Sequence, residues 1–280
     1  MSHTAKKMIT ILDGPVGTEL LARGIPTPLP AWSADALTAA PDVIREIHAA
    51  YAAAGATVHS TNTFRTRPAT AGDHWAALAL KAVRLARQSV PEDHRIAGSM
   101  APIADCYRPD LSPANPRPDH RALALVLAEA GVDLLLCETF PHVDEARIAV
   151  EEAVATGVET WVALTAGHGA DLLTPLALAE GAARAVDAGA SAVLVNCVPA
   201  SRTLPYVQAL AQLGVPFGAY ANAGHPDEGV GWRSGPPGPE RYLAWARTWV
   251  DCGATLIGGC CGTGPDHIAA LKSMFIDRNH

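Results

Sequence analysis

The chain has 280 residues, of which 49% are hydrophobic, so it can form a large domain with a sizeable core. Its formal net charge is -7 and no basic stretch is dense, which argues against a nucleic-acid partner. No apolar run approaches the roughly 18 residues that a membrane-spanning helix needs, so we expect no membrane segment.

Apolar runs alternate with longer, alanine-rich stretches along the chain. The apolar runs predict eight strands, at residues 8–12, 57–61, 96–99, 133–137, 160–164, 192–196, 216–220 and 255–257. The stretches between them predict helices, among them residues 41–55, 74–89, 120–130 and a last helix after Pro265. Eight strands that alternate with helices over this length predict a single (β/α)8 TIM barrel, an α/β domain over residues 1–280. A doubly wound open sheet is the alternative.

Proline- and glycine-rich segments at residues 108–118 and 223–239 predict two long loops. Each follows a predicted strand, so in a barrel both lie on the catalytic face, where long loops often bind or cover ligands. The C-terminal ends of the strands carry thiols, carboxylates and amides, at Asp13, Asn62, Glu138, Asn196, Cys197, Asn222, Cys260 and Cys261. Because this set contains no Ser–His pair, it favours metal activation of a ligand over triad hydrolysis.

Three cysteines at strand ends are the most informative residues. Cys197 ends one predicted strand, and Cys260 and Cys261 follow another within a glycine-rich turn. The N-terminus lacks the apolar core of a signal peptide, so we expect a cytoplasmic protein with reduced thiols. Three convergent thiols with a fourth position open are typical of a catalytic zinc site, and the alternative is that they are small buried hydrophobic residues. The other cysteines are expected to be core, structural or incidental residues: Cys106, Cys137 and Cys252.

Two carboxylates at strand ends are candidates for binding a ligand ammonium group. Asp13, between Leu12 and Gly14, either binds such a group or caps the next helix. Glu138 follows an apolar strand and is expected to be partly buried, where a carboxylate needs a partner. That partner is either a cationic ligand, which we favour, or an internal Arg or Lys.

The remaining strand-end residues carry weaker signals. Thr63 and Phe64 offer a hydroxyl group and an aromatic wall to a small ligand, or else pack at the strand end. Asn196 either orients a ligand or satisfies loop backbone. Four aromatic residues either face a ligand cation or pack in the fold: Trp32, Tyr107, Tyr220 and Trp232. No phosphate-loop lysine and no G-x-G-x-x-G before a helix is present, so nucleotide binding is poorly supported.

In their order along the chain, these motifs resemble the zinc-dependent homocysteine S-methyltransferases, which include the betaine– and S-methylmethionine–homocysteine methyltransferases. The resemblance runs along nearly the whole chain. It rests on Leu12-Asp13-Gly14 with Gly17-Thr18-Glu19, Trp32-Ser33-Ala34 followed by Pro41 and His48, Thr61-Asn62-Thr63-Phe64, Gly98-Ser99, Cys137-Glu138-Thr139, Asn196-Cys197 and Gly258-Gly259-Cys260-Cys261-Gly262-Thr263. The last motif, with an Asn-Cys upstream, is highly specific.

The resemblance implies a (β/α)8 barrel that holds Zn2+ on Cys197, Cys260 and Cys261. It also implies roles for the substrate residues: Asp13 and Glu138 hold the amino group of homocysteine, Thr63 and Phe64 line the amino-acid site, and Trp32 lies near the methyl donor. The implied reaction transfers a methyl group from a small donor, S-methylmethionine or a related sulfonium or betaine, to homocysteine and gives methionine.

Two segments depart from the family pattern and leave the donor open. Residues 165–176 keep Thr-Pro-Leu but lack the Asp-Gly that often precedes it, and the loop at residues 223–239 is individual. The alternatives are a methylcobalamin or corrinoid-protein donor, a selenocysteine or other thiol acceptor, and a zinc- or thiol-binding barrel without turnover. Because the carboxylates and the three cysteines are all intact, an enzyme is favoured.

Overall fold

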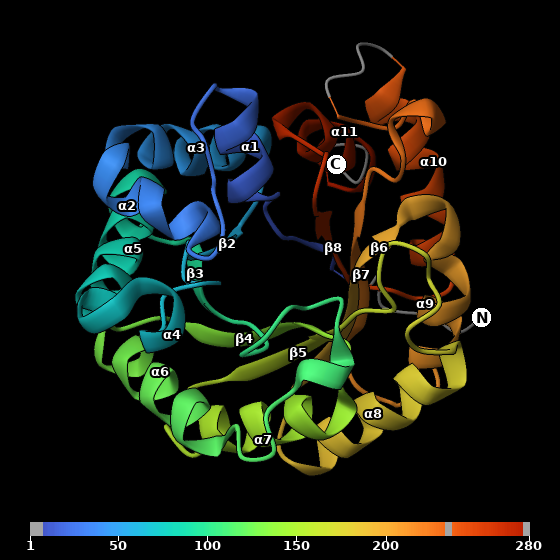
Figure 1. Cartoon of the computed structure of the whole chain (residues 1–280). Coiled ribbons are helices and arrows are strands. Elements are labelled where there is room, and N and C mark those ends of the chain that lie inside the picture. The colour runs from blue at the N-terminus through green and yellow to red at the C-terminus, as the bar shows by residue number, and fades with distance from the viewer. Residues whose placement is uncertain (1–7, 233–236, 277–280) are drawn as a thin grey trace.

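Eight parallel strands form the centre of the molecule, and the helices form a ring around them (Figure 1). The computed structural model describes residues 8–232 and 237–276. The strands are β1 (Thr10–Ile11), β2 (Val58–Ser60), β3 (Arg95–Met100), β4 (Leu134–Phe140), β5 (Thr160–Leu164), β6 (Ala192–Pro199), β7 (Phe217–Asn222) and β8 (Leu256–Gly259). They are hydrogen-bonded in the order β1-β8-β7-β6-β5-β4-β3-β2, and a parallel bridge from Leu12 to Val58 joins the two ends. The predicted TIM barrel is therefore confirmed.

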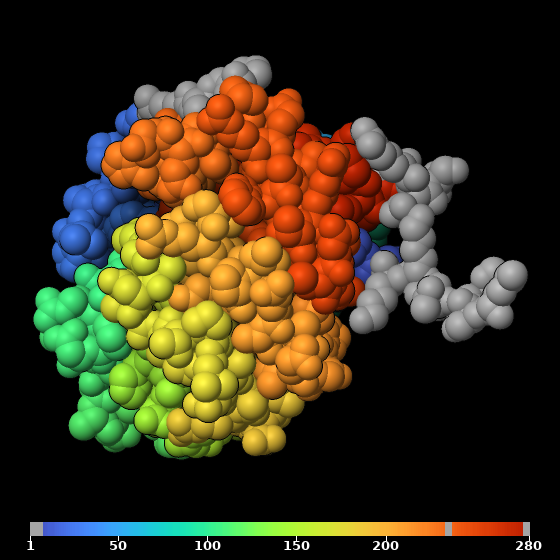
Figure 2. All heavy atoms as spheres, turned by 90° about the vertical axis from the view of Figure 1, so that its right-hand side faces the viewer, coloured from blue at the N-terminus to red at the C-terminus, as the bar shows by residue number. Residues whose placement is uncertain are grey.

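The helices are α1 (Val16–Ala22), α2 (Ala36–Ala39), α3 (Pro41–Ala54), α4 (Pro68–Ala71), α5 (Trp75–Ser89), α6 (Arg117–Glu129), α7 (Val143–Val154), α8 (Pro175–Asp187), α9 (Leu204–Leu210), α10 (Gly238–Asp251) and α11 (Pro265–Phe275). From the side, α8, α9 and α10 form a continuous outer wall (Figure 2). Helix α3 begins with Pro41 in its first turn, a position that proline favours, and ends at the C-cap Gly55, whose left-handed φ of 110° is favourable for glycine. None of the helices of the described residues combines the length and apolarity that crossing a membrane requires.

Most strand residues are apolar because both faces of each strand are buried, and among the polar exceptions Glu138, Thr139 and Asn196 lie near the C-terminal ends of β4 and β6. In β4, Leu134 and Leu136 point into the barrel and pack with Leu12 and Leu194, whereas Leu135 packs outward against the helices. Side chains alternate across a strand, so each strand contributes to the core inside the barrel and to the core between the barrel and the helices. This continuous burial explains why unbroken apolar runs located the strands.

Most predicted strand boundaries differ from the structure by one or two residues, and the largest differences lie at two loops and at β4 and β6. Helix α6 begins at Arg117 rather than residue 120, because Pro118 suits a first helical turn, so the loop predicted at 108–118 ends at Pro116. The loop predicted at 223–239 contains a short 3-10 helix, Pro226–Glu228, and α10 begins at Gly238; residues 233–236 of this loop lie outside the described residues. Strands β4 and β6 extend beyond the predicted ends, through irregular register near Thr139 and Cys197.

Gly218 in β7 is a position where a side chain would collide with backbone. A Cβ there would lie 1.7 Å from the carbonyl oxygen of Leu256 in the paired strand β8. We expect Gly218→Ala to lower the free energy of unfolding by about 2–3 kcal/mol, because the paired backbone cannot move aside as a flexible side chain can. Gly98→Ala in β3 is the control, since its Cβ would meet only side chains, the nearest being Leu135 at 3.1 Å. Urea unfolding of both variants measures the difference, and equal losses would contradict the explanation.

Candidate metal centre and substrate cavity

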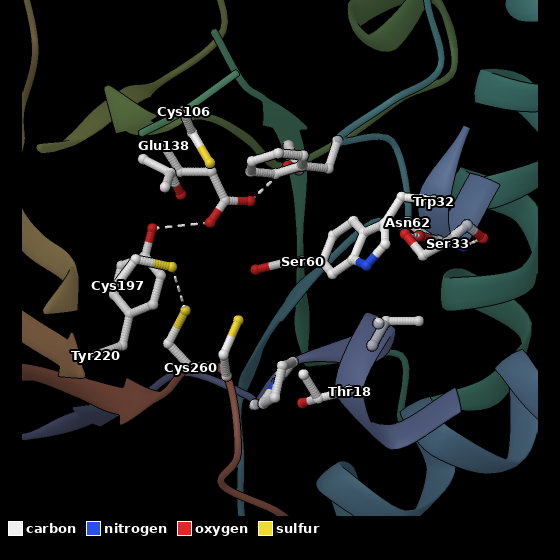
Figure 3. A pocket seen from close by; sticks show the side chains of 18 of the residues that line it. Thr18, Trp32, Ser33, Ser60, Asn62, Cys106, Glu138, Cys197, Tyr220 and Cys260 are labelled. Carbon is white, nitrogen blue, oxygen red and sulfur yellow. Dashed lines mark hydrogen bonds between the residues drawn. The ribbon is translucent and has the colours of Figure 1, made fainter. Parts of the chain in front are cut away.

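A cavity of about 400 Å³ opens at the C-terminal ends of the strands (Figure 3). Its wall combines thiols, carboxylates and aromatic rings from both ends of the chain, among them Asp13, Trp32, Phe64, Tyr107, Glu138, His168, Cys197, Tyr220, Trp232, Cys260 and Cys261. In Figure 3, Trp32 lies across the cavity from Cys197 and Cys260. The site therefore sits on the face of the barrel where enzymes of this fold carry theirs.

The three cysteines converge on one side of this cavity. The sulfur atoms of Cys197, Cys260 and Cys261 all lie within 4.8 Å of one another, and those of Cys197 and Cys260 are 2.8 Å apart. Cys197 has a left-handed backbone, with φ 52°, at an irregular part of β6, and this bend turns its side chain toward the end of β8. Gly262 follows the pair at φ 82°, a conformation that glycine adopts without strain.

The donor set of this cluster suits a metal ion. All three cysteines are free thiols, and Cys197 and Cys260 are buried. Hydrogen bonds from Cys197 and Cys260 hold the pKa of the Cys261 thiol well below its usual range, whereas contacts among the three thiols and burial raise the pKa of Cys197 and of Cys260. Without a metal, Cys261 is therefore the thiol that readily carries negative charge. Three soft thiolate ligands on one wall, open to a cavity on the other side, match a metal site with one position free for a ligand.

Glu138 reaches the cavity from the end of β4. Its carboxylate accepts hydrogen bonds from the Ser99 hydroxyl and, at 3.0 Å, from the Tyr220 hydroxyl. Burial raises its pKa, although these two hydrogen bonds act in the opposite direction. None of the ion pairs formed by the described residues includes Glu138, so the internal Arg or Lys considered as its partner is not found there.

Asp13 lies on the same wall, after β1. Its carboxylate accepts a hydrogen bond of 2.9 Å from the backbone N–H of Ser60, and burial raises its pKa well above the usual value. It does not cap the next helix: the N-cap of α1 is Pro15, which makes no side-chain cap. The proximity of Glu138 raises the pKa of Asp13 further, so the cavity has two buried carboxylates that favour a cationic ligand.

Aromatic side chains form the rest of the wall. Trp32 and Phe64 meet edge to face with ring centroids 5.6 Å apart, and Tyr107 packs against His168 at 3.9 Å. Trp232 is 41% exposed at the rim. His168 was missed by the strand-end argument because it lies four residues beyond β5, in a loop whose path the sequence pattern does not reveal.

Two predicted substrate residues do not belong to the cavity wall. Thr63 is fully buried and donates its hydroxyl hydrogen to the Ser99 carbonyl. Asn196 is also fully buried; its amide accepts from the Thr139 N–H and donates to the Thr139 hydroxyl, at 3.1 and 2.7 Å. The backbone bends at Thr139, directly after Glu138, with a left-handed φ of 63°. The two hydrogen bonds with Asn196 stabilise this bend. The direct contact of Thr63 and Asn196 with substrate stays a prediction.

The remaining cysteines divide between core and cavity. Cys137 is fully buried in β4, as expected, and Cys252 is partly buried after α10. Cys106 lies in the loop between β3 and α6 and lines the cavity, a position that the strand-end pattern does not predict. It is therefore part of the substrate wall rather than an incidental residue.

Glu145 in α7 anchors the loop that carries Cys106 and Tyr107. It accepts hydrogen bonds from the Ile103 N–H at 2.8 Å and the Ser112 hydroxyl at 2.6 Å. It also lies 3.1 Å from Nε2 of His120. Burial alone would raise its pKa, but the hydrogen bonds outweigh burial and lower it.

We expect Glu145→Gln to lower the free energy of unfolding by about 1–3 kcal/mol at pH 7, because the amide replaces an acceptor of several hydrogen bonds. A carboxylate with a lowered pKa in the folded state stabilises the fold above its unfolded pKa and loses this effect as the pH falls through the folded pKa. The difference between the variant and the wild type should therefore shrink below about pH 4. Urea unfolding at both pH values tests this, with exposed Glu129→Gln as the control; a constant difference would contradict it.

Comparisons with known proteins agree with this site. A family model described as homocysteine S-methyltransferase matches residues 10–275. The chain is 33% identical to homocysteine S-methyltransferase of Escherichia coli, over 96% of each protein. It is 31% identical to homocysteine S-methyltransferase YbgG of Bacillus subtilis, over 95% of this chain and 94% of the relative. The crystal structure of the Escherichia coli homocysteine methyltransferase MmuM in its metallated form superposes with a TM-score of 0.79 at 30% identity, over 96% of each chain. The chain belongs to the homocysteine S-methyltransferase family.

Proposed function

We propose that the protein transfers a methyl group from a small donor to the sulfur of homocysteine, giving methionine, with a zinc ion held by Cys197, Cys260 and Cys261. One observation carries the proposal: three convergent thiols face the same cavity as two buried carboxylates that form no ion pair with a described Arg or Lys. The thiols suit the sulfur end of the acceptor and the carboxylates its ammonium group. Family membership supports the same assignment.

The residues of the chain divide the work of binding and orientation. Zn2+, when bound, keeps a coordinated thiol deprotonated and so supplies an electron-rich sulfur. Asp13 and Glu138 bind the ammonium group and fix the direction of the acceptor chain. Ser99 and Tyr220 hold the Glu138 carboxylate in place through their hydroxyl groups. Alignment of the acceptor sulfur with the methyl group is the main catalytic contribution that such a site makes.

The donor is proposed to be a sulfonium compound such as S-methylmethionine, or a betaine. The new sulfur–methyl bond forms as the bond from the methyl carbon to the positive sulfur or nitrogen breaks, and the electron pair of that bond stays with the donor. Because the donor is already activated by its charge, no general base is required. Trp32 lies across the cavity from Cys197 and Cys260 (Figure 3) and offers an aromatic face that attracts a cation, and Phe64 and Tyr107 line the same cavity.

Methionine formation by the zinc-loaded protein tests the proposal, with S-methylmethionine, betaine, dimethyl sulfonium compounds and methylcobalamin as donors in parallel. Turnover with one donor supports the reaction and identifies the donor. Turnover only when selenocysteine replaces homocysteine would change the assigned acceptor. Turnover only with a corrinoid protein would change the assigned donor. Bound zinc without turnover for any combination would favour a non-catalytic barrel. One domain over residues 1–280, a cytoplasmic location and the absence of a nucleic-acid partner stay predictions.

A further inference from the structure

A second group of potential metal ligands lies behind the wall of the cavity. Asp13 follows β1, His48 lies on the buried face of α3, and His59 lies in β2. Each offers one ligand atom, and these three atoms all lie within 4.8 Å of one another. The side chains are buried, with 4% of Asp13 and 0% of either histidine exposed. This group shares no residue with the three cysteines.

The histidines of this group lack the partners that buried polar atoms normally have. Both ring nitrogens of His48 and Nδ1 of His59 form no hydrogen bond of acceptable geometry with the described residues, although the backbone of Ala56 lies close enough to the His59 ring to act against the lowering of its pKa. A buried polar atom without a partner is energetically costly, so such atoms are rare and call for a bound ligand or water. Three of them at one place indicate a common partner.

The other nitrogen of His59 is held by a neighbour. Its Nε2 lies 3.0 Å from Nδ1 of His94, and the two rings are stacked with centroids 5.3 Å apart. When His59 donates its Nε2 hydrogen to His94, its Nδ1 carries a free lone pair. Metal-binding histidines commonly use their second nitrogen in this way, which fixes the ring and its tautomer.

The charges of the group also suit a cation. Burial lowers the pKa of His48 to about 4 and that of His59 to about 3, so both rings are neutral at pH 7 and have lone pairs to offer. The buried Asp13 carboxylate forms no ion pair with a described Arg or Lys. A metal ion would supply the positively charged partner that this carboxylate lacks among the described residues.

We propose that Asp13, His48 and His59 form a second metal site, which binds a divalent first-row transition ion such as Zn2+ or Co2+. Two imidazoles and a carboxylate are ligands that these ions accept, and they leave further positions for water. Asp13 lines the cavity, so an ion can reach the site from there. The proposal does not rest on the methyl transfer, but the site shares Asp13 with the proposed ammonium site, so an ion there would compete with a substrate ammonium group for the same carboxylate.

Co2+ titration of the reduced, metal-stripped full-length protein tests this site. Equilibrium dialysis with elemental analysis gives the total ions bound, and the sulfur-to-cobalt charge-transfer absorption reports the cysteine cluster separately. We expect two ions per chain in the wild type, only one of them on sulfur. His59→Val and His48→Gln should each bind one ion with the sulfur absorption intact, and His94→Gln should weaken the second ion by roughly 10–100-fold. His74→Gln, at an exposed histidine, is the control.

Several outcomes would overturn the site. A wild-type protein that binds one ion, all of it reported by sulfur absorption, would leave a trapped water as the partner of the three nitrogens. A second ion that survives in both histidine variants would belong elsewhere on the chain. Circular dichroism checks that each variant is folded, and because the variants change different elements, β2 and α3, one of them suffices if the other does not fold.

Discussion

Cys260→Ala is expected to remove both the bound metal and the methyl-transfer activity. The sulfur of Cys260 lies 2.8 Å from that of Cys197 and belongs to the three-thiol cluster, so its loss leaves two sulfur ligands. Even residues that only support metal ligands change metal affinity by about 10–100-fold, so loss of a ligand should exceed about 100-fold in affinity and activity. Zinc per chain, measured by elemental analysis, and methionine formation are the two readouts.

Cys252→Ala is the matched control for this prediction. Cys252 is a free thiol that lies after α10 and is not part of the cavity wall, so zinc content and activity should stay at wild-type levels. The test also separates ligand loss from misfolding, because thermal unfolding of Cys260→Ala without metal should resemble that of the metal-stripped wild type. Stoichiometric zinc with full activity in Cys260→Ala would remove Cys260 from the site.

The fold was predictable because the barrel strands are buried on both faces. Leu134, Leu135 and Leu136 belong to two different cores, yet all three are apolar, so the run marks a strand without the alternation that a half-exposed strand shows. Helix starts were less predictable. Pro116 and Pro118 flank the first residue of α6, and proline is equally common in a loop and in a first helical turn.

The site was predictable where it depends on strand ends and hidden where it depends on loops. The ends of parallel strands meet on one face, which is why Cys197 and Cys260 were expected to converge. The left-handed backbone at Thr139 and Cys197 could not be predicted from the sequence, because neither residue type favours that conformation. His168 reaches the cavity by the path of a loop, which only the tertiary structure reveals.

The second histidine group was hidden for a related reason. His48 belongs to a helix and His59 to a strand, and their separation in sequence matches no standard metal-binding motif. Apolar periodicity predicts which face of α3 is buried, and His48 lies on that face beside Ile47 and Tyr51. What the periodicity cannot predict is that a second buried histidine from β2 points at the same place, since this depends on how the helix packs on the barrel.

Glu138→Gln is expected to weaken homocysteine binding while the metal content stays at the wild-type level. The carboxylate is buried, is held by Ser99 and Tyr220, and forms no ion pair with a described residue, and the proposed partner is the ammonium group of the ligand. Glutamine keeps the size of the side chain but removes its charge. Loss of one charge from such a buried pair costs about 2–4 kcal/mol, or roughly 30- to 1,000-fold in Kd.

Calorimetric titration of the zinc-loaded variant with homocysteine measures this loss, and elemental analysis confirms the zinc. Because burial raises the pKa of Glu138, the wild type should lose homocysteine affinity as the pH falls through that raised pKa and the carboxylate becomes neutral. The variant has no charge to lose at this position, so its affinity should depend less on pH in the same range.

Tyr220→Phe, which keeps the charge and removes one hydrogen bond, should lose much less affinity than Glu138→Gln. If Glu138→Gln binds homocysteine as the wild type does, Asp13 alone holds the ammonium group and Glu138 serves only to shape the cavity.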